Sequence, residues 1–168
     1  ITITPKSYTG FNYNSGASTA TGVVQPDGSL VLELYYDRNI YEVTFNGNNG
    51  SPVEQKYNVK HGGTVTPTTP TRTHYTFDGW DQPYATITSA LIVNAKWKAD
   101  DFTITYNDTY GLANTNPATY TIETPTITLT NLADRTTHTF KGWYTAASGG
   151  TKVTQIVKGS TGNKVLYA

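Results

Sequence analysis

The 168-residue chain contains no cysteine and no methionine. Disulfides, which many small secreted domains use to compensate for a thin core, are therefore excluded. The absence of both sulfur-containing side chains fits a surface exposed to oxidants, where neither would persist. Twelve basic and twelve acidic side chains give a formal net charge of zero. This balance argues against nucleic acid and against a polybasic membrane-surface module, because both partners require several cations on one face.

Catalytic and metal-binding patterns are also missing. The three histidines, His61, His74 and His138, have no cysteine to join them and no helical or hairpin spacing, so a zinc site lacks its convergent ligands. The adjacent carboxylates Asp100 and Asp101 point apart if they lie in an extended segment. No stretch approaches the length of a membrane-spanning helix. We therefore expect no enzyme activity, no catalytic residue, no metal, no cofactor and no membrane insertion.

The side chains that are abundant favour strands. Threonine is the commonest residue, and thirteen Tyr, five Phe and three Trp supply most of the large apolar groups. Such residues fit a pleated, half-buried surface, whereas the helix formers Leu, Ala, Glu and Lys are scarce. Alternating polarity predicts a mainly β fold with little helix. The expected strands are Ser29–Tyr36, Tyr41–Phe45, Leu91–Trp97, Phe102–Tyr106, Tyr120–Leu129 and Lys164–Ala168.

One unit is written twice along the chain. "YEVTFN" and "FTITYN", which begin at Tyr41 and Phe102, share the pattern aromatic–x–aliphatic–Thr–aromatic–Asn. "RTHYTFDGW" from Arg72 then matches "RTTHTFKGW" from Arg135, and each copy ends on a strand that carries an alanine. Such self-similarity is typical of repeat architectures. We predict three parts: residues 1–39, a first module at 40–99 and a second module at 100–168.

The repeated Gly-Trp phrase has two interpretations. Exposed tryptophans could stack on sugars, with Tyr84 and Tyr144 extending the platform. Alternatively, each tryptophan fills the core of a small module that has no disulfide, where one large ring contributes much of the stability. We favour the core, because the phrase recurs with unrelated flanks, and we expect Trp80 and Trp143 to be equivalent. The expected core residues are Tyr41, Phe45, Phe77, Trp80, Trp97, Phe102, Phe140 and Trp143.

The order of these features resembles the internalin B repeat, or Listeria–Bacteroides repeat. Thr137 and His138 depart from the Gly-Tyr pair usual in that family. Residues 1–39, with "YTGFNYNSG" and "DGSLVLELYYDRN", resemble the C-terminal part of a mucin-binding-type surface repeat. The resemblance implies small β-grasp-like modules strung in an elongated array. It also implies an extracellular location, at the cell surface or anchored to the cell wall of a Gram-positive bacterium.

Two roles remain open at this point. The first is a stalk or spacer with weak adhesion, whose partners are neighbouring repeats of the same chain and which belongs to a longer protein. The second is an adhesin module that binds a host glycan or protein directly through exposed aromatic side chains. Aromatic residues near turns, outside clear alternation, are the candidates for ligand contact: Tyr8, Phe11, Tyr13 and Tyr84.

The short connections between the expected strands generate a prediction about shape. "YDRNIYEV" and "KWKADDFTI" leave few free residues between strands, so bending at both joints should be limited. Small-angle scattering should give a radius of gyration well above the ~16 Å expected for a compact domain of this length. A value near ~16 Å would contradict the elongated array.

Overall fold

The computed structural model describes residues 1–168 and contains thirteen strands and no helix. The prediction of a mainly β fold is therefore confirmed. The chain divides into two compact units. The first unit comprises Ile1–Thr71 and Phe77–Lys96, and the second comprises Arg72–Thr76 and Trp97–Ala168. Each unit has its own cluster of buried hydrophobic side chains.

A hairpin begins the first unit. Its strands β1 (Phe11–Thr19) and β2 (Glu33–Arg38) pair antiparallel, with an irregularity between Asn14 and Thr19. The strand expected at Ser29 starts only at Glu33, because the ladder with β1 ends there. No apolar side chain of residues 1–39 is buried, and Val23, Val24 and Val31 are all exposed. The hairpin thus has no hydrophobic core of its own.

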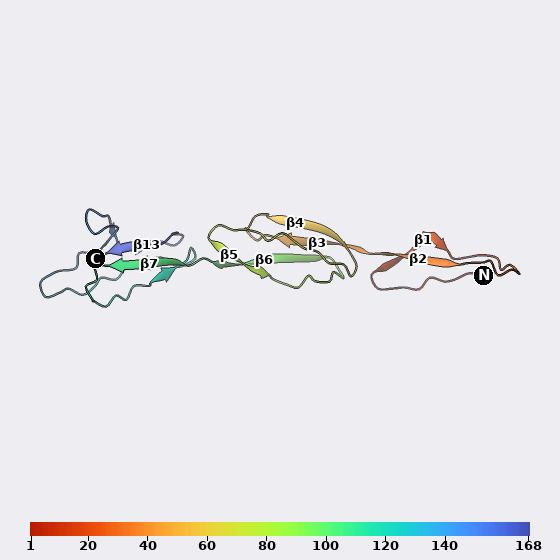
Figure 1. Ribbon diagram of the computed structural model, residues 1–168, viewed down its shortest axis with the longest axis horizontal. Helices are drawn as coiled ribbons and strands as arrows, with labels where there is room; N and C mark the ends of the chain where they lie inside the picture. The colour runs from red at the N-terminus through yellow and green to blue at the C-terminus, as the bar shows by residue number, and fades with distance from the viewer. The chain divides into compact units, whose positions relative to one another are not determined.

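The rest of the first unit is built on one mixed sheet. Its strands β3 (Ile40–Asn46), β4 (Glu54–Lys60), β5 (Tyr75–Trp80) and β6 (Leu91–Ala99) lie in the order β4-β3-β6-β5 (Figure 1). The first and last of these strands, β3 and β6, pair in parallel at the centre, with Phe45 opposite Val93. The buried cluster packs around this pair and consists of Val43, Phe45, Val59, Ile87 and Val93.

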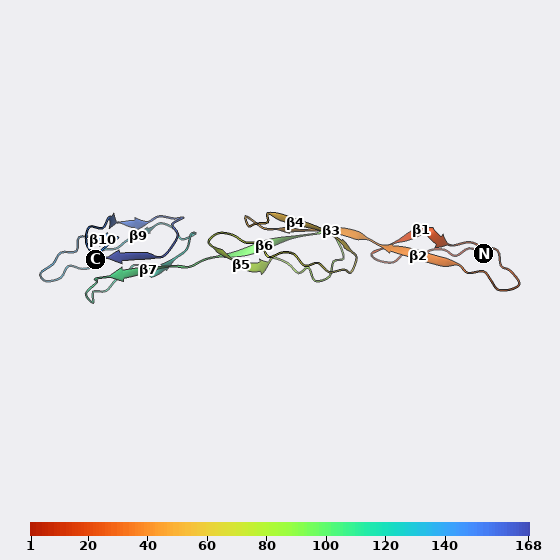
Figure 2. The ribbon, with the colours of Figure 1, turned by 45° about the horizontal axis from the view of Figure 1, so that its top comes forward.

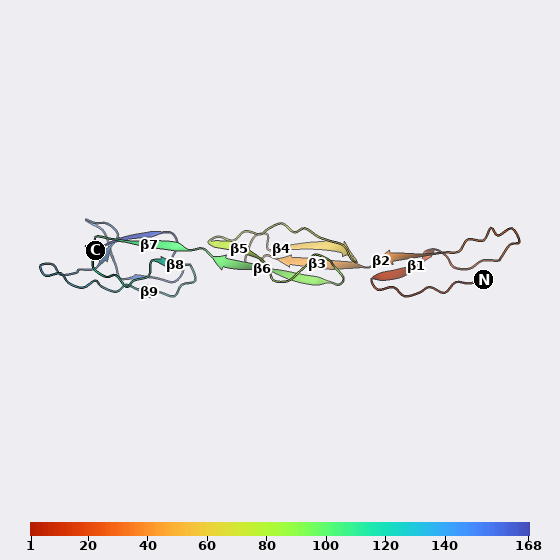
Figure 3. The same cartoon turned by 60° about the horizontal axis from the view of Figure 1, so that its bottom comes forward.

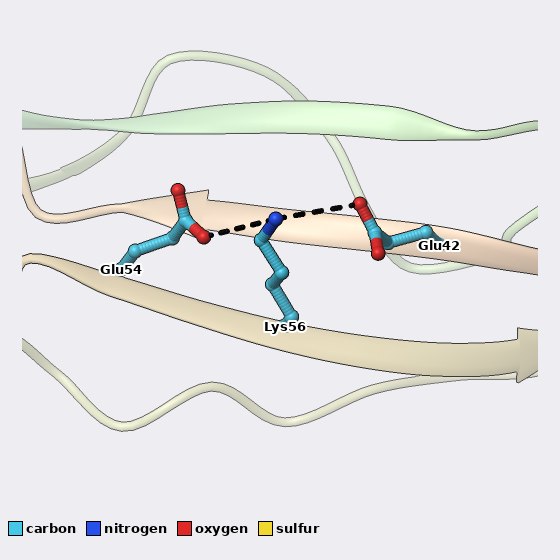
Figure 4. A network of polar contacts seen from close by, with 3 residues as sticks. All are labelled: Glu42, Glu54 and Lys56. Atoms are coloured by element: carbon cyan, nitrogen blue, oxygen red, sulfur yellow. Dashed lines mark ion pairs between the residues drawn. The ribbon is translucent and has the colours of Figure 1, made fainter.

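Charged side chains of the edge strand β4 and its neighbour β3 form a small network on one face of the sheet. Lys56 lies between two carboxylates, with its Nζ 3.2 Å from Glu54 Oε1 and 3.7 Å from Glu42 Oε1 (Figure 4). The hydrogen bond to Glu54 and the charge of Glu42 raise the pKa of Lys56. All three side chains are about half exposed, so solvent screens these pairs and they add little stability. Charges on an edge strand do oppose pairing with another chain.

The second unit repeats the plan of the first. Strands β7 (Phe102–Asn107), β8 (Thr119–Tyr120), β10 (Trp143–Tyr144), β11 (Lys152–Val153) and β13 (Lys164–Tyr167) lie in the order β11-β10-β13-β7-β8. Here β7 and β13 form the central parallel pair, and β8 flanks β7 (Figure 3). Strands β9 (Ile127–Thr128) and β12 (Gln155–Ile156) form a separate two-stranded sheet (Figure 2). The buried cluster is Ile104, Tyr120, Leu129, Leu132, Trp143, Ile156 and Leu166.

The continuous strand expected at Tyr120–Leu129 is wrong. The chain leaves β8 after Tyr120 and re-enters a strand only at Ile127. A turn closes between them, in which Thr124 N donates to Thr121 O at 3.1 Å and Thr121 N donates to Thr124 Oγ1 at 2.8 Å. Threonine hydroxyls compete for backbone groups in this way, and Pro125 removes a further donor, so alternation alone misjudged the segment.

The repeated tryptophans are not equivalent. Trp143 is 1% exposed and its indole Nε1–H donates to Thr130 O at 2.9 Å. Trp80 is half-buried and packs at the margin of its cluster, against Phe45 and Phe77. Of the eight residues expected in the cores, Phe45 and Trp143 are fully buried. The other six are half-buried: Tyr41, Phe77, Trp80, Trp97, Phe102 and Phe140.

His61 joins the hairpin to the sheet within the first unit. Its ring lies 6.2 Å from Phe11 and 6.0 Å from Tyr41, and a Cβ on Gly10 would stand 2.1 Å from the imidazole. The backbone is bonded alongside: Asn39 N donates to Gly10 O at 2.8 Å, and His61 N donates to Asn39 O at 2.7 Å. A side chain at position 10 would therefore push the hairpin from the histidine.

The burial difference predicts unequal costs for removing the two tryptophans. Trp143→Ala should cost about 3–5 kcal/mol and unfold the second unit, whereas Trp80→Ala should cost about 1–3 kcal/mol. Urea unfolding with residue-resolved NMR measures both, and amides of β3 should stay protected in Trp143→Ala because that cluster is separate. Equal costs would show that the two rings contribute alike.

A second prediction isolates the contact between Gly10 and His61. Gly10 (φ 79°) and Gly28 (φ 72°) share a left-handed backbone, but nothing lies within 4 Å of a Cβ placed on Gly28. Gly10→Ala should therefore lose more stability than Gly28→Ala, since only the former adds a collision to the shared backbone strain. Hydrogen exchange at the Asn39 and His61 amides should accelerate in Gly10→Ala alone. Matching exchange rates in the two variants would remove the role given to His61.

Candidate functional site

The structure contains no group of three or more His, Asp or Glu side chains that could hold a metal ion. It likewise has no helix that is long and apolar enough to cross a membrane. The candidate ligand-contact residues are aromatic, so the positions of the exposed rings and of the polar groups around them are described next.

Tyr8 and Tyr13 meet around one tyrosine of β2. Tyr8 packs edge-on against Tyr36 with ring centroids 4.9 Å apart, and Tyr13 lies 5.8 Å from the same ring. The Tyr36 hydroxyl accepts a hydrogen bond from Lys6 N at 3.0 Å. Tyr8 remains about half exposed. These contacts stabilise the hairpin, so Tyr8, Tyr13 and Tyr36 have a structural role that is independent of any ligand.

The other two candidates lie elsewhere in the first unit. Phe11 faces His61, as described above, and is partly exposed. Tyr84 is half-buried and packs edge-on against Phe45 at 5.0 Å. No ring contact joins Tyr84 to the hairpin aromatics, so the structure does not gather the four candidates into one patch.

Tyr84 and Trp80 do share an open depression of the first unit, which Phe77 and Gln82 also line. Asp81 lies at its border, where its carboxylate accepts hydrogen bonds from the side chain and backbone of Asn94, both at 2.8 Å. These bonds hold the pKa of Asp81 below its usual range. The depression brings together the two rings that a sugar-stacking platform would require.

A more enclosed groove of about 640 Å³ lies in the second unit. Volumes of this size are usual for small-ligand sites. Leu132 and Phe140 contribute apolar surface, and the side chains that could contact a ligand are Tyr110, Arg135, His138, Lys141, Tyr144 and Tyr167. Tyr144 and Tyr167 are cross-strand partners on β10 and β13. None of the hydroxyls of Tyr110, Tyr144 and Tyr167 makes a hydrogen bond within the protein.

Tyr110 stands at the rim of this groove. It is 71% exposed, and the Arg135 guanidinium lies 4.6 Å from the centre of its ring. In the core of the same unit, Tyr106 packs against Trp143 at 4.8 Å and donates its hydroxyl to Pro117 O at 3.1 Å. Burial raises the pKa of Tyr106 to about 12, so this phenol stays protonated and neutral.

Tyr144 could be proposed from the sequence as part of an aromatic platform, whereas Tyr110, Arg135 and Tyr167 were not predicted as binding residues. A signal for Tyr110 exists in the repeat itself. Three residues after the last Asn of the opening strand, the first module has Asn49 and the second has Tyr110. Asparagine is frequent in turns because it tolerates a left-handed backbone, whereas tyrosine at such a place needs a separate reason.

Comparisons with known proteins agree with the repeat found in the fold. The family model described as Listeria-Bacteroides repeat domain matches residues 41–95 and 102–168. A protein named "Putative membrane protein" from Evansella cellulosilytica is 25% identical over 130 residues, which cover 69% of this chain and 19% of that protein. The chain thus spans about a fifth of that relative's length. No solved structure matches.

The matched segments coincide with the two sheets. The first match begins at Tyr41 in β3 and ends at Ala95 in β6, and the second runs from Phe102 in β7 to the residue after β13. Repeats of this family are a non-catalytic type of domain, typical of bacterial surface proteins. The chain belongs to the Listeria-Bacteroides repeat family, with two tandem copies.

Proposed function

We propose that this chain is an extracellular stalk segment of a bacterial cell-surface protein, in which tandem repeats separate the parts of the parent chain on either side. The observation that carries the proposal is the shortness of the connections. Asn39 alone separates β2 from β3, and Asp100 and Asp101 alone separate β6 from β7. Connections of this length leave few dihedral angles to vary.

The chemistry of each repeat supports the same role. Each buries its own hydrophobic cluster, so a unit can be added or removed without opening the core of its neighbour. The strands present a surface rich in Thr and Asn, and the chain has no net charge that would attract a charged partner over a distance. The family's occurrence in surface proteins supports attachment to the cell surface or the cell wall.

Adhesion through the depression of the first unit is a second candidate function. It is favoured by the placement of Trp80 and Tyr84 along one open surface, because sugars lay their apolar ring faces on such rings. The same two rings also pack on Phe45, which gives them a role in the core. The stalk is therefore the preferred proposal.

A stalk requires a narrow range of distances across the joint between the modules. Cysteines introduced at exposed Ile92 in the first module and Val157 in the second can carry spin labels, and the chain has no other thiol. Double electron–electron resonance should give a single narrow distribution. A control with a flexible Gly-Ser insert between Asp100 and Asp101 should broaden it. A distribution as broad in the unmodified chain as in the control would refute the stalk.

A further inference from the structure

The two modules use equivalent positions for different chemistry. In the first unit Asp81 follows the repeated tryptophan and hydrogen-bonds to Asn94, which lies beside Asn46 in the parallel pair. In the second unit the residue after the tryptophan is Tyr144, and its cross-strand partner Tyr167 lies beside Asn107. A polar Asp–Asn pair is thus replaced by a pair of tyrosines.

Tyr110 adds a third tyrosine at a cost to the fold. Its φ is 51°, and the equivalent Asn49 has φ 69°, so both repeats place a non-glycine residue in the left-handed region here. Asparagine suits that conformation, whereas a bulky side chain is strained in it. Tyr110 is 71% exposed, so burial of its ring does not offset the strain. Since the first unit folds with Asn49, the fold itself does not require a tyrosine.

The cations of the groove are also rearranged. In the first module Arg72 stacks on Tyr75, with the guanidinium 3.5 Å from the ring centre. In the second module His138 occupies the position of Tyr75, and Arg135 stacks on Tyr110 instead. The Arg135 side chain has no ion pair and no hydrogen bond, so all five of its N–H donors are free.

The second module also carries more positive charge around this groove than the first module has at the equivalent positions. Two residues before each repeated tryptophan, the first module has Asp78 and the second has Lys141. Lys141 is exposed and makes no ion pair. Asp108 is the one acidic side chain among the residues that line the groove, against the cations Arg135 and Lys141. The groove therefore combines flat aromatic surface with a small excess of positive charge.

We propose that this groove of the second unit is a binding site for an acidic oligosaccharide. The rings of Tyr110, Tyr144 and Tyr167 take the apolar faces of successive sugar rings, and their unused hydroxyls bond to sugar hydroxyls. Arg135 receives the carboxylate or sulfate, because its stacking on Tyr110 holds its donors in place and its guanidinium makes no ion pair within the protein. This activity goes beyond the stalk role and does not depend on it.

The test begins with a glycan array that contains uronate-bearing, sialylated, sulfated and neutral oligosaccharides, probed with the whole chain. We expect the strongest signals on acidic members. Titration calorimetry with the strongest uronate or sialic-acid binder, and with the methyl ester of the same oligosaccharide, then isolates the charge. Removing the charge should weaken binding by about tenfold or more.

The first module supplies substitutions that the fold already accepts. Tyr110→Asn and Tyr167→Asn install the residues of the first unit and should weaken binding by about tenfold or more each. Tyr110→Asn should leave the melting temperature equal or higher, because it relieves the strained backbone. Arg135→Gln should abolish the preference for the acid over its methyl ester while the fold stays intact.

Controls separate this site from other aromatic surfaces. Tyr35→Ala removes a tyrosine that is 48% exposed on the hairpin, and it should leave binding unchanged. Tyr84→Ala tests the depression of the first unit. Loss of binding in Tyr84→Ala, with Tyr110→Asn unaffected, would move the site to the first unit and overturn the proposal. No array signal on any acidic glycan, or equal affinity for the acid and its ester, would overturn it as well.

Discussion

The first and last strands of each module pair in parallel, and this pairing sets the order of the other strands and the position of the core. In the first unit β3 lies beside β6, and in the second β7 lies beside β13. A parallel pair requires a long crossover, which commonly contains a helix. Here the crossover consists of further strands and loops. One outer strand therefore pairs with each member of the central pair, and the loops must cover the sheet to make a core.

That arrangement explains why aromatic side chains carry so much of the packing. With no helix to lay over the sheet, each cluster is thin, and rings fill the space between the strands and the loops. Phe45 contacts Tyr57, Trp80 and Tyr84, while Trp143 contacts Tyr106 and Phe140. The rings pack mainly edge to face, which adds to the stability gained from burial. Positions outside these contacts are free to differ, and the two modules differ there in charge and in aromatic content.

Because surface positions can vary while the fold is kept, the same fold can serve both proposed activities. A stalk requires only paired strands and short connections. Both modules meet these two conditions although their surface side chains differ. A ligand site asks for particular side chains at the ends of β10 and β13 and in the turn after β7. The second module has tyrosines there and the first has Asp and Asn. One backbone plan is thus compatible with the proposed spacer and, in one copy, carries a groove whose Arg135 guanidinium makes no ion pair.

The β class, the repeat and the central strands β3, β6, β7 and β13 could be predicted from the sequence, because alternation and the repeated phrases are local patterns that burial enforces residue by residue. The hairpin strand β1 and the outer strands β4 and β5 were not predicted, because they are exposed on at least one face and their alternation is weaker. It did not determine the break after Tyr120, since a threonine turn competes with a strand of equal alternation. The different burial of Trp80 and Trp143 was also hidden, because one phrase occupies two sites with different neighbours. The groove could not be predicted from the sequence, because Tyr110, Arg135 and Tyr167 are distant along the chain and come together through the pairing of β13 with β7.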